Sequence, residues 1–303
     1  MRRLPITALF LLLCGLGSAH AANTLDSTPR TVVMSAFEEE LTQLLAATSD
    51  THEYRVNGVR FTTGTLSGKP VVLFLSGVSM TNAAMNTQLA LDRFNVQRIV
   101  FSGIAGGVNP ALHIGDVSVP AQWGSYLEAL FARETAPGQF TPSDGRGSEF
   151  PNFDMMFIRP VRVLRAESTG EERRFWFPVD AQLLAVAAGL KDVPLDDCVA
   201  DKSVCLSHAP KLLVGGNGVA GQAFVDNARF REYAFKTFAA NVLDMESAAV
   251  AQVAYANGTP YIVFRSLSDL AGGGEGGNEL KTFFRIAAKN SARVVTAFLK
   301  ALP

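Results

Sequence analysis

Four polar segments of the chain carry groups that can do acid–base or binding chemistry. They are Glu38-Glu39-Glu40, Gly103 to Gly107, Asp244-Met245-Glu246 and Ser266-Leu267-Ser268-Asp269. Carboxyl groups can donate or accept protons and can hold negative charge beside a developing cation. The amides of a glycine-rich segment can bind an anion or a ribose. Because each segment follows an apolar run typical of a strand, and ligands of open α/β sheets bind beyond the strands' carboxyl ends, the four segments predict one site there.

Each segment also has a purely structural explanation. The three glutamates fall in the first turn of a predicted helix, where the macrodipole stabilises negative charge by about 0.3–1 kcal/mol each. Gly103 to Gly107 can form a tight turn, and Asp269 can cap a helix after the apolar run Ile262-Val263-Phe264. Glu246 is harder to explain in this way, because it lies between an apolar strand and an apolar helix, and a buried carboxylate needs a partner.

Strands and helices alternate along most of the chain. The predicted strands are Thr31–Ala36, Tyr54–Leu66, Val71–Leu75, Val96–Phe101, Asp116–Val119, Lys211–Val214, Val242–Met245 and Tyr261–Arg265. The predicted helices are Glu38–Ala47, Ala83–Phe94, Ala181–Leu190, Asp226–Phe238, Ser247–Ala256 and Leu280–Leu302. This order predicts the α/β class, with a three-layer α/β/α sandwich around a central mixed, largely parallel sheet.

The N-terminus has the pattern of a signal peptide. Arg2 and Arg3 precede the apolar run Ile6 to Leu16, and small residues lead to an expected cleavage site after Ala21. The apolar run is shorter than the roughly 20 residues that a membrane anchor needs. A lipoprotein would need small residues before Cys14, where three leucines stand. We therefore expect an exported protein, periplasmic or secreted, that is free of the membrane after cleavage.

The mature chain, residues 22–303, is expected to form a single domain. The stretch from about 124 to 178 is rich in turn residues and lacks sustained periodicity, so we interpret it as a long insertion. The formal net charge of -1 and the hydrophobic content of 48% describe an ordinary globular protein. Without a basic stripe, neither nucleic acid nor another polyanionic partner is implied.

Cysteine and histidine usage argues against a metal site. Cys198 and Cys205 remain after removal of the signal peptide, and in an oxidising compartment they are expected to form a small surface disulfide. Their spacing does not fit a redox or zinc motif, and His52, His113 and His208 lie far apart in the sequence. We expect neither a metal nor another cofactor.

Six short motifs in order resemble the nucleoside phosphorylase and nucleosidase family, and within it the methylthioadenosine/S-adenosylhomocysteine nucleosidases. The motifs are Ala36-Phe37-Glu38-Glu39-Glu40, Gly103-Ile104-Ala105-Gly106-Gly107, Gly115-Asp116-Val117, Ala223-Phe224-Val225, Met245-Glu246-Ser247-Ala248-Ala249 and Arg265-Ser266-Leu267-Ser268-Asp269. The similarity spans about residue 30 to the C-terminus. The segments around Phe224, Glu246 and Asp269 also resemble exported plant bark storage proteins, which share the fold.

The resemblance implies hydrolysis of the N-glycosidic bond of purine nucleosides, of the methylthioadenosine, S-adenosylhomocysteine or adenosine type. Asp269 would protonate the purine at N7, oriented by Ser268. Phe224 would stack on the base, and the backbone of Val225 would bind its edge. Adenine or another purine base would be released.

The resemblance also assigns residues to the sugar and to water. Glu246 would accept hydrogen bonds from the ribose hydroxyls, Met245 would pack beside the sugar, and Glu40 would position and deprotonate the attacking water. Further substrate contacts are expected from Phe37, Ala105 and Gly106. Ile104 departs from the family pattern, because a hydroxyl residue that helps the ribose and water site is usual there. Relatives are usually homodimers or homotrimers, so we expect an oligomer.

Three alternatives remain open. The first is a phosphorylase, which usually carries an arginine before the glycine-rich turn. Ser102 stands there instead, but Arg30 and Arg98 could bind phosphate and leave phosphorolysis as an alternative. A non-catalytic exported nucleoside-binding or storage protein could share the fold. The third is an NAD-dependent oxidoreductase, since Gly216 to Gly221 satisfies GxGxxG after a predicted strand, although the next predicted helix begins beyond the motif.

Overall fold

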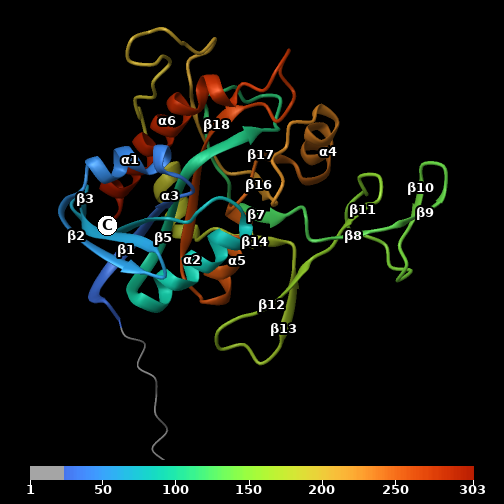
Figure 1. Ribbon diagram of the computed structural model, residues 1–303, viewed down its shortest axis with the longest axis horizontal. Helices are drawn as coiled ribbons and strands as arrows, with labels where there is room; N and C mark the ends of the chain where they lie inside the picture. The colour runs from blue at the N-terminus through green and yellow to red at the C-terminus, as the bar shows by residue number, and fades with distance from the viewer. Residues whose placement is uncertain (1–23) are drawn as a thin grey trace, which may run out of the picture.

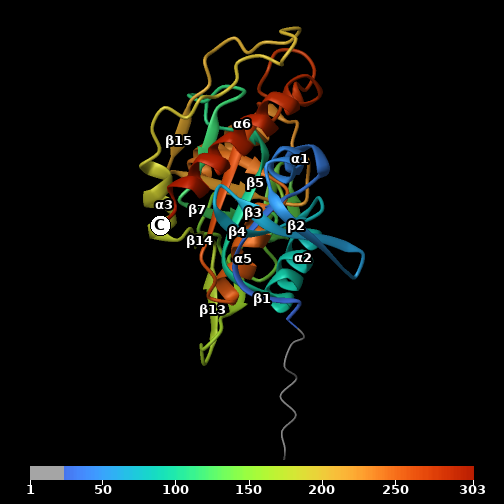
Figure 2. The same cartoon turned by 90° about the vertical axis from the view of Figure 1, so that its left-hand side faces the viewer.

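The computed structural model describes residues 24–303. The predicted signal peptide, residues 1–21, lies outside them. One large mixed sheet forms the centre of the described chain, with the strand order β14-β7-β16-β17-β5-β1-β4-β3-β2 and with β6, β15 and β18 joined to it off this path. Figures 1 and 2 show α1 and α6 on one side of this sheet and α2 and α5 on the other. The predicted three-layer α/β class with a mixed sheet is confirmed.

The strands of the central sheet are β1 (Asp26–Ser35), β2 (Ser49–Val56), β3 (Val59–Leu66), β4 (Lys69–Leu75), β5 (Phe94–Gly107), β6 (Val117–Val119), β7 (Gln122–Ser125), β14 (Trp176–Pro178), β15 (Leu212–Val214), β16 (Asn217–Ala220), β17 (Ala240–Asp244) and β18 (Tyr261–Asp269). The helices are α1 (Glu38–Ala46), α2 (Met80–Arg93), α3 (Ala181–Ala188), α4 (Ala228–Phe238), α5 (Ser247–Ala256) and α6 (Leu280–Ala301). The predicted helices agree with these bounds to within a few residues.

Parallel pairing brings the ends of several strands to one edge of the sheet. Strand β1 pairs in parallel with β4 and β5, and β5 pairs in parallel with β18. Antiparallel pairs, such as β17 with β5 and β18 with β6, make the sheet mixed. Every residue of β18 is buried, and Phe298 of α6 packs against Phe264 with ring centroids 5.0 Å apart. The amphipathic helix α6 therefore fixes the strand that ends at Asp269.

Two glycine-rich segments are strands rather than turns. Gly103 to Gly107 forms the last part of β5, where the sequence suggested a turn. Gly216 to Gly221 contains β16, which pairs with β7 and β17. A side chain at Gly218 would meet the ring of Trp123 at 2.7 Å, so close packing within the sheet explains this glycine. The dinucleotide interpretation is wrong, because that fingerprint needs a loop that opens a helix.

Residues between β7 and β14 form hairpins that project from the body (Figure 1). Their strands are β8 (Ala129–Phe131), β9 (Arg133–Ala136), β10 (Gln139–Thr141), β11 (Met156–Ile158), β12 (Val161–Leu164) and β13 (Glu171–Arg174). Three small antiparallel sheets result, β8 with β11, β9 with β10, and β12 with β13. These short strands were not predicted, because their segment is rich in turn residues. The boundaries of the insertion, about 124 and 178, stay a prediction.

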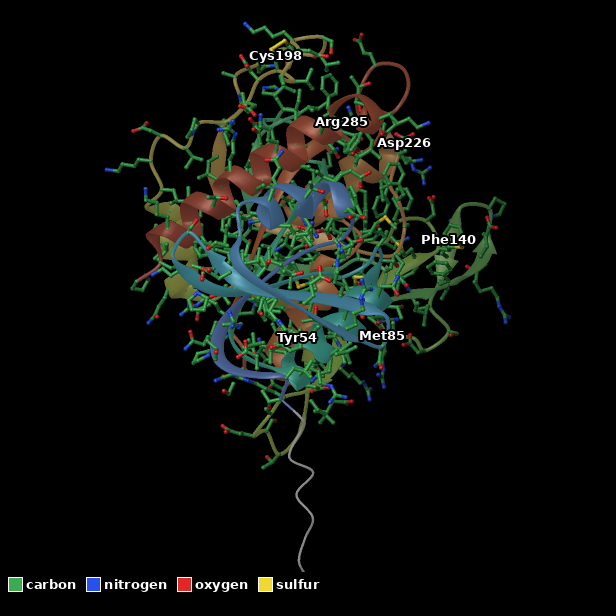
Figure 3. All side chains as sticks on the ribbon, turned by 60° about the vertical axis from the view of Figure 1, so that its left-hand side comes forward. Tyr54, Met85, Phe140, Cys198, Asp226 and Arg285 are labelled. Atoms are coloured by element: carbon green, nitrogen blue, oxygen red, sulfur yellow. A yellow bond between two sulfur atoms is a disulfide. The ribbon has the colours of Figure 1, made fainter. Side chains whose placement is uncertain are left out.

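The loop before β15 carries a disulfide between Cys198 and Cys205, as predicted. Figure 3 shows it at Cys198, beyond the end of α6. The loop is tied to α6, because Asp196 forms ion pairs with Lys289 at 2.5 Å and Arg293 at 2.9 Å. In residues 24–303, none of the helices combines the length and the apolar composition needed to span a membrane.

Candidate active site

A cavity of about 450 Å³ opens at the carboxyl ends of β1, β5, β17 and β18. Seven segments line it: the β1–α1 junction, the β4–α2 loop, the end of β5, the segment before α4, the β17–α5 junction, the end of β18, and the first turns of α6. All the predicted site residues line this active-site cavity: Phe37, Glu40, Ala105, Gly106, Phe224, Val225, Met245, Glu246, Ser268 and Asp269. The structure thus brings together predicted residues from five segments, while their individual roles stay predictions.

Glu40 does more than stabilise the start of α1. Its side chain turns inward and is only 2% exposed, whereas Glu38 and Glu39 remain at the surface. Its Oε2 accepts a hydrogen bond from the N–H of Ala36 at 2.8 Å, and its Oε1 accepts one from the N–H of Ile104 at 2.7 Å. Burial raises the pKa of Glu40 to about 7, against the opposing attraction of Arg265. This carboxyl group can therefore exchange a proton near neutral pH.

Arg265 lies at the centre of the charged groups beneath the cavity. It is fully buried, and its Nε donates to Oδ2 of Asp244 at 2.6 Å. Its Nη2 lies 3.6 Å from Oε2 of Glu246, and its guanidinium carbon stands 4.0 Å from the centroid of the Phe101 ring. Among the described residues, Nη1 has no hydrogen-bond partner. One donor of Arg265 thus remains available beside the carboxylates.

Gly103 leaves the space in which Arg265 and Glu40 approach each other. A Cβ atom at this position would collide with Nη1 of Arg265 and would lie 2.7 Å from Oε1 of Glu40. The glycine is therefore required by side-chain packing, because any larger residue would displace the guanidinium or the carboxylate. Nη1 and Oε1 consequently face the same small space.

Glu246 caps α5 and faces the cavity with 5% of its surface exposed. Its Oε1 accepts a hydrogen bond from the N–H of Ser79 at 2.7 Å. Burial and the neighbouring carboxylate of Asp244 raise the pKa of Glu246 to about 7. Asp244 itself is held by the N–H of Ser247 at 3.0 Å and by Arg265. The partner that the sequence demanded for a buried Glu246 is thus Arg265 together with a backbone N–H.

Asp269 closes the other side of the cavity at the end of β18. It is 2% exposed, its Oδ2 accepts from the hydroxyl of Ser268 at 2.9 Å, and its Oδ1 accepts from the N–H of Ala271 at 2.8 Å. Burial raises its pKa, as an acid that works near neutral pH requires. The protein itself therefore supplies the burial of Asp269, without a bound ligand.

The segment before α4 forms the mouth of the cavity. Phe224 is 54% exposed and lines the cavity, so a face of its ring is free to stack on a planar ligand. The hydroxyl of Tyr126 donates to the carbonyl of Ala223 at 3.1 Å and fixes this segment from below. Val225 is buried beside it.

Arg265, Asp244 and Lys281 were not predicted as site residues. The signal for Arg265 was visible, because a lone arginine inside the apolar run that ends in Asp269 has to be paired when buried. Asp244 was noticed in its segment but received no role. Lys281 lies in the first turn of α6, where the sequence alone gave no reason to expect a cavity wall.

The two arginines that favoured phosphorolysis lie elsewhere. Arg30 pairs with Asp26 at 2.6 Å, and Arg98 donates to the hydroxyl of Thr31 at 3.3 Å. Both occupy the early parts of β1 and β5, whereas the cavity lies at the carboxyl ends. Among the described residues that line the cavity, Lys281 is the only cation. Residues 24–303 contain no group of three or more histidine, cysteine or acidic side chains that could hold a metal ion.

Comparison with known proteins gives the same family over nearly the whole chain. The model of the phosphorylase superfamily matches residues 30–300. A 5′-methylthioadenosine/S-adenosylhomocysteine nucleosidase from Bacillus licheniformis is 30% identical over 271 residues, which cover 88% of this chain and 97% of the relative. Bark storage protein A from Populus deltoides is 27% identical over 269 residues, 86% of this chain and 83% of the relative.

The solved structures agree with the sequence relatives. The structure of a 5′-methylthioadenosine/S-adenosylhomocysteine nucleosidase from Colwellia psychrerythraea in complex with adenine superimposes with a TM-score of 0.67. The two chains are 25% identical, and the match covers 92% of this chain and 97% of the other. The overall fold is thus shared with a nucleosidase whose structure contains bound adenine.

Proposed function

This chain belongs to the phosphorylase superfamily, and we propose that it hydrolyses the N-glycosidic bond of purine nucleosides. One observation carries the proposal: the active-site cavity is lined by three buried carboxyl groups with raised pKa values, Glu40, Glu246 and Asp269, and the fully buried Arg265 lies beneath it. Cleavage of a ribosyl–purine bond needs an acid for the base, negative charge beside the sugar, and an activated water. The cavity supplies each of these.

The base leaves from the side of the cavity that Asp269 closes. As the bond between C1′ and the purine nitrogen breaks, Asp269 donates its proton to N7, so that the base departs as a neutral molecule. Burial raises the pKa of Asp269, which favours the protonated form that this step needs. Ser268 holds one carboxyl oxygen at 2.9 Å, and the exposed ring of Phe224 stacks on the purine.

The sugar and the water occupy the side with Glu246 and Glu40. The ionised Glu246 accepts hydrogen bonds from the ribose hydroxyls and stabilises the cationic character that develops at C1′. Glu40 accepts a proton from the water while the oxygen of that water forms the new bond to C1′. Arg265, whose Nη1 lies on the same side of Gly103 as Oε1 of Glu40, favours the ionised form of Glu40 that accepts this proton.

The nucleophile is water rather than phosphate because of the charge of the cavity. A phosphate dianion would enter next to Glu40, Asp244 and Glu246, which outnumber the single buried Arg265, and Lys281 is the only cation in the described cavity lining. Repulsion between a phosphate dianion and these carboxylates is strong in a buried site. Water meets no such barrier.

A non-catalytic binding or storage role is the second candidate. It is favoured by the similarity to bark storage protein A and by the apolar Ile104, which lines the cavity beside Glu40. The three buried carboxyl groups that line the cavity nevertheless support catalysis. A protein that only binds or stores would not need the buried Glu40.

Export and assembly are parts of the same proposal. The predicted signal peptide, residues 1–21, and the disulfide between Cys198 and Cys205 support a periplasmic or secreted protein. Val78 and Phe224 at the mouth of the cavity are 44% and 54% exposed, which supports a homodimer or homotrimer that covers them.

The decisive assay incubates the purified mature protein with methylthioadenosine, S-adenosylhomocysteine, adenosine and inosine, with and without phosphate. Chromatography separates the base from the sugar product. Free base with a free ribose species in the absence of phosphate supports hydrolysis. A ribose 1-phosphate that appears only with phosphate would make the protein a phosphorylase.

Matched variants connect this activity to the cavity. Asp269→Asn and Glu246→Gln are expected to lower kcat by about 10²–10⁴-fold while circular dichroism shows an unchanged fold. Glu38→Gln, at an exposed glutamate of the same helical turn that does not line the cavity, serves as the control that keeps activity. If binding of adenine is normal but no substrate is cleaved even by the wild type, the storage role is correct instead.

A further inference from the structure

A second cavity of about 450 Å³ lies outside the active site, between the projecting hairpins and α5. Four guanidinium groups line it, from Arg146, Arg159, Arg162 and Arg173. We call it the arginine cleft. Figure 1 shows the β12–β13 hairpin and the β8–β11 pair, which flank it, on the side of the molecule away from α1 and α6. The residues of the arginine cleft take no part in the proposed reaction.

The register of the β12–β13 hairpin forces two of these arginines together. Arg162 and Arg173 are cross-strand partners, and both are exposed. Like charges directly opposite each other destabilise a β-ladder. Arg162 has a long ion pair with Glu171, 3.4 Å between exposed side chains, which relieves little of this repulsion. The hairpin therefore holds two positive charges side by side, and the exposed ion pair with Glu171 offsets them only weakly.

The arginines of the cleft differ in how they are held. Arg159 is fixed by Asp144 at 3.1 Å and by the carbonyl of Gly147 at 2.7 Å, so its role is to fold the loop. The side chains of Arg146 and Arg173 form no hydrogen bond or ion pair with any residue in 24–303. The guanidinium groups of Arg146 and Arg173, together with that of the weakly paired Arg162, can thus donate hydrogen bonds to a ligand.

On the opposite face of the same hairpin, Arg174 has the hydrogen-bond and ring contacts that Arg173 lacks. Arg174 donates to Glu172 at 2.7 Å and lies 4.5 Å from the centroid of the Tyr255 ring. Glu172 also accepts from the hydroxyl of Tyr255 at 2.6 Å. One strand, β13, therefore carries a fully partnered arginine on one face and an unpartnered one, Arg173, on the other.

We propose that the arginine cleft binds a small molecule through a phosphate-type oxyanion group. Guanidinium groups donate paired hydrogen bonds that match the geometry of phosphate oxygens, and an anion between Arg162 and Arg173 would remove their repulsion. The volume of the cleft lies in the range of small-molecule sites. Gln252 of α5 lines the cleft and can donate a further hydrogen bond. This proposal is independent of the proposed nucleosidase function.

Acidic groups near the cleft restrict the ligand to a small one. Asp144 and Glu128 also line it; Asp144 is held by Arg159, while the exposed Glu128 would oppose an anion. The whole chain has a net charge of -1, so it lacks the extended positive surface that a polyanion requires. A compact oxyanion can contact the arginines and avoid Glu128.

Calorimetric titration of the mature protein with inorganic phosphate and pyrophosphate tests the proposal. The wild type is expected to bind pyrophosphate more tightly than phosphate, and Arg162→Ala and Arg173→Ala are each expected to weaken binding about tenfold or more. Arg133→Ala removes an exposed arginine of the same hairpin region outside the cleft and should bind like the wild type. Glu128→Gln should bind more tightly, because it removes the opposing charge.

Two further variants separate the arginine cleft from other sources of binding. Lys281→Ala removes the cation of the active-site cavity and should leave the affinity for pyrophosphate unchanged. Loss of binding in Lys281→Ala but not in Arg162→Ala or Arg173→Ala would overturn the proposal. So would the absence of binding, or Arg173-dependent binding of heparin without binding of either small anion. Thermal unfolding of each variant, expected to match the wild type, verifies the fold.

Discussion

The active-site cavity and the arginine cleft hold their charges in opposite ways. In the cavity, Arg265 is fully buried and is paired with Asp244 and Glu246. In the cleft, Arg162 and Arg173 are exposed and face each other. Burial makes an unpaired charge prohibitively costly, whereas water tolerates one. The charges of the cavity therefore have to be paired within the protein before a ligand binds. The charges of the cleft can remain unpaired until a ligand neutralises them.

The largest expected effect separates the two arginines by stability. Arg265→Met leaves Asp244 and Glu246 without their cation in a buried site, so we expect a loss of about 3–5 kcal/mol in the free energy of unfolding and complete loss of nucleoside cleavage. Arg173→Met, in the cleft, should change that free energy by no more than about 0.5 kcal/mol. Urea denaturation of both variants measures the difference. Equal losses would contradict the comparison.

Two glycines extend the comparison to packing. Gly103→Ala places a Cβ atom against Nη1 of Arg265 and 2.7 Å from Glu40, and we expect a loss of about 1–3 kcal/mol in the free energy of unfolding together with a lower kcat. Gly170→Ala lies in the β12–β13 hairpin, where no atom comes within 4 Å of the added methyl group. It should behave like the wild type in both thermal unfolding and cleavage assays. A harmless Gly103→Ala would show that the close approach is not required.

A smaller effect concerns pH. Burial raises the pKa values of Glu40 and Glu246 from 4.5 to about 7. Between these values the folded state binds more protons than the unfolded state, so the free energy of unfolding should fall as the pH rises from about 4.5 to 7, by at most about 1.4 kcal/mol per pH unit for each group.

Glu246→Gln tests this pH dependence, because it removes one of the two titrating groups. Its unfolding free energy, measured by urea denaturation at several pH values, should decline less steeply than that of the wild type. Glu171→Gln changes an exposed carboxylate of the β12–β13 hairpin and should keep the wild-type slope. An unchanged slope in Glu246→Gln would mean that Glu246 ionises normally.

The sequence predicted the cavity well because its groups follow a simple rule. Polar residues directly after apolar strands have to meet at the carboxyl edge of the sheet, and Glu40, Glu246 and Asp269 obey this rule. The helices were predicted equally well, since their apolar spacing is long and regular. Arg265 was missed because it lies inside a strand, whereas the rule considers only residues that directly follow one.

The arginine cleft could not be predicted in the same way. Its strands contain three or four residues each, too few for alternation to stand out from turn-rich surroundings. Arg162 and Arg173 become neighbours only through the register of the hairpin, which the spacing of two separated arginines does not reveal. The near-neutral net charge further concealed the local positive charge, since acidic residues in the same segment offset it.

The smallest expected effect concerns Ile104, whose N–H donates to Glu40 and whose side chain lines the cavity. Ile104→Ser places a hydroxyl group in the cavity beside the proposed water site. One added hydrogen bond is worth about 0.5–1.5 kcal/mol, so kcat/KM for methylthioadenosine should rise about two- to tenfold.

Ile104→Val is the matched control, because it changes the volume of the side chain without adding a hydroxyl group. Steady-state rates of base release compare the two variants. If the serine variant is faster and the valine variant is not, the apolar residue limits an otherwise complete nucleosidase site. If neither is faster, Glu40 already holds the water without a hydroxyl partner, and the departure at Ile104 is neutral for catalysis.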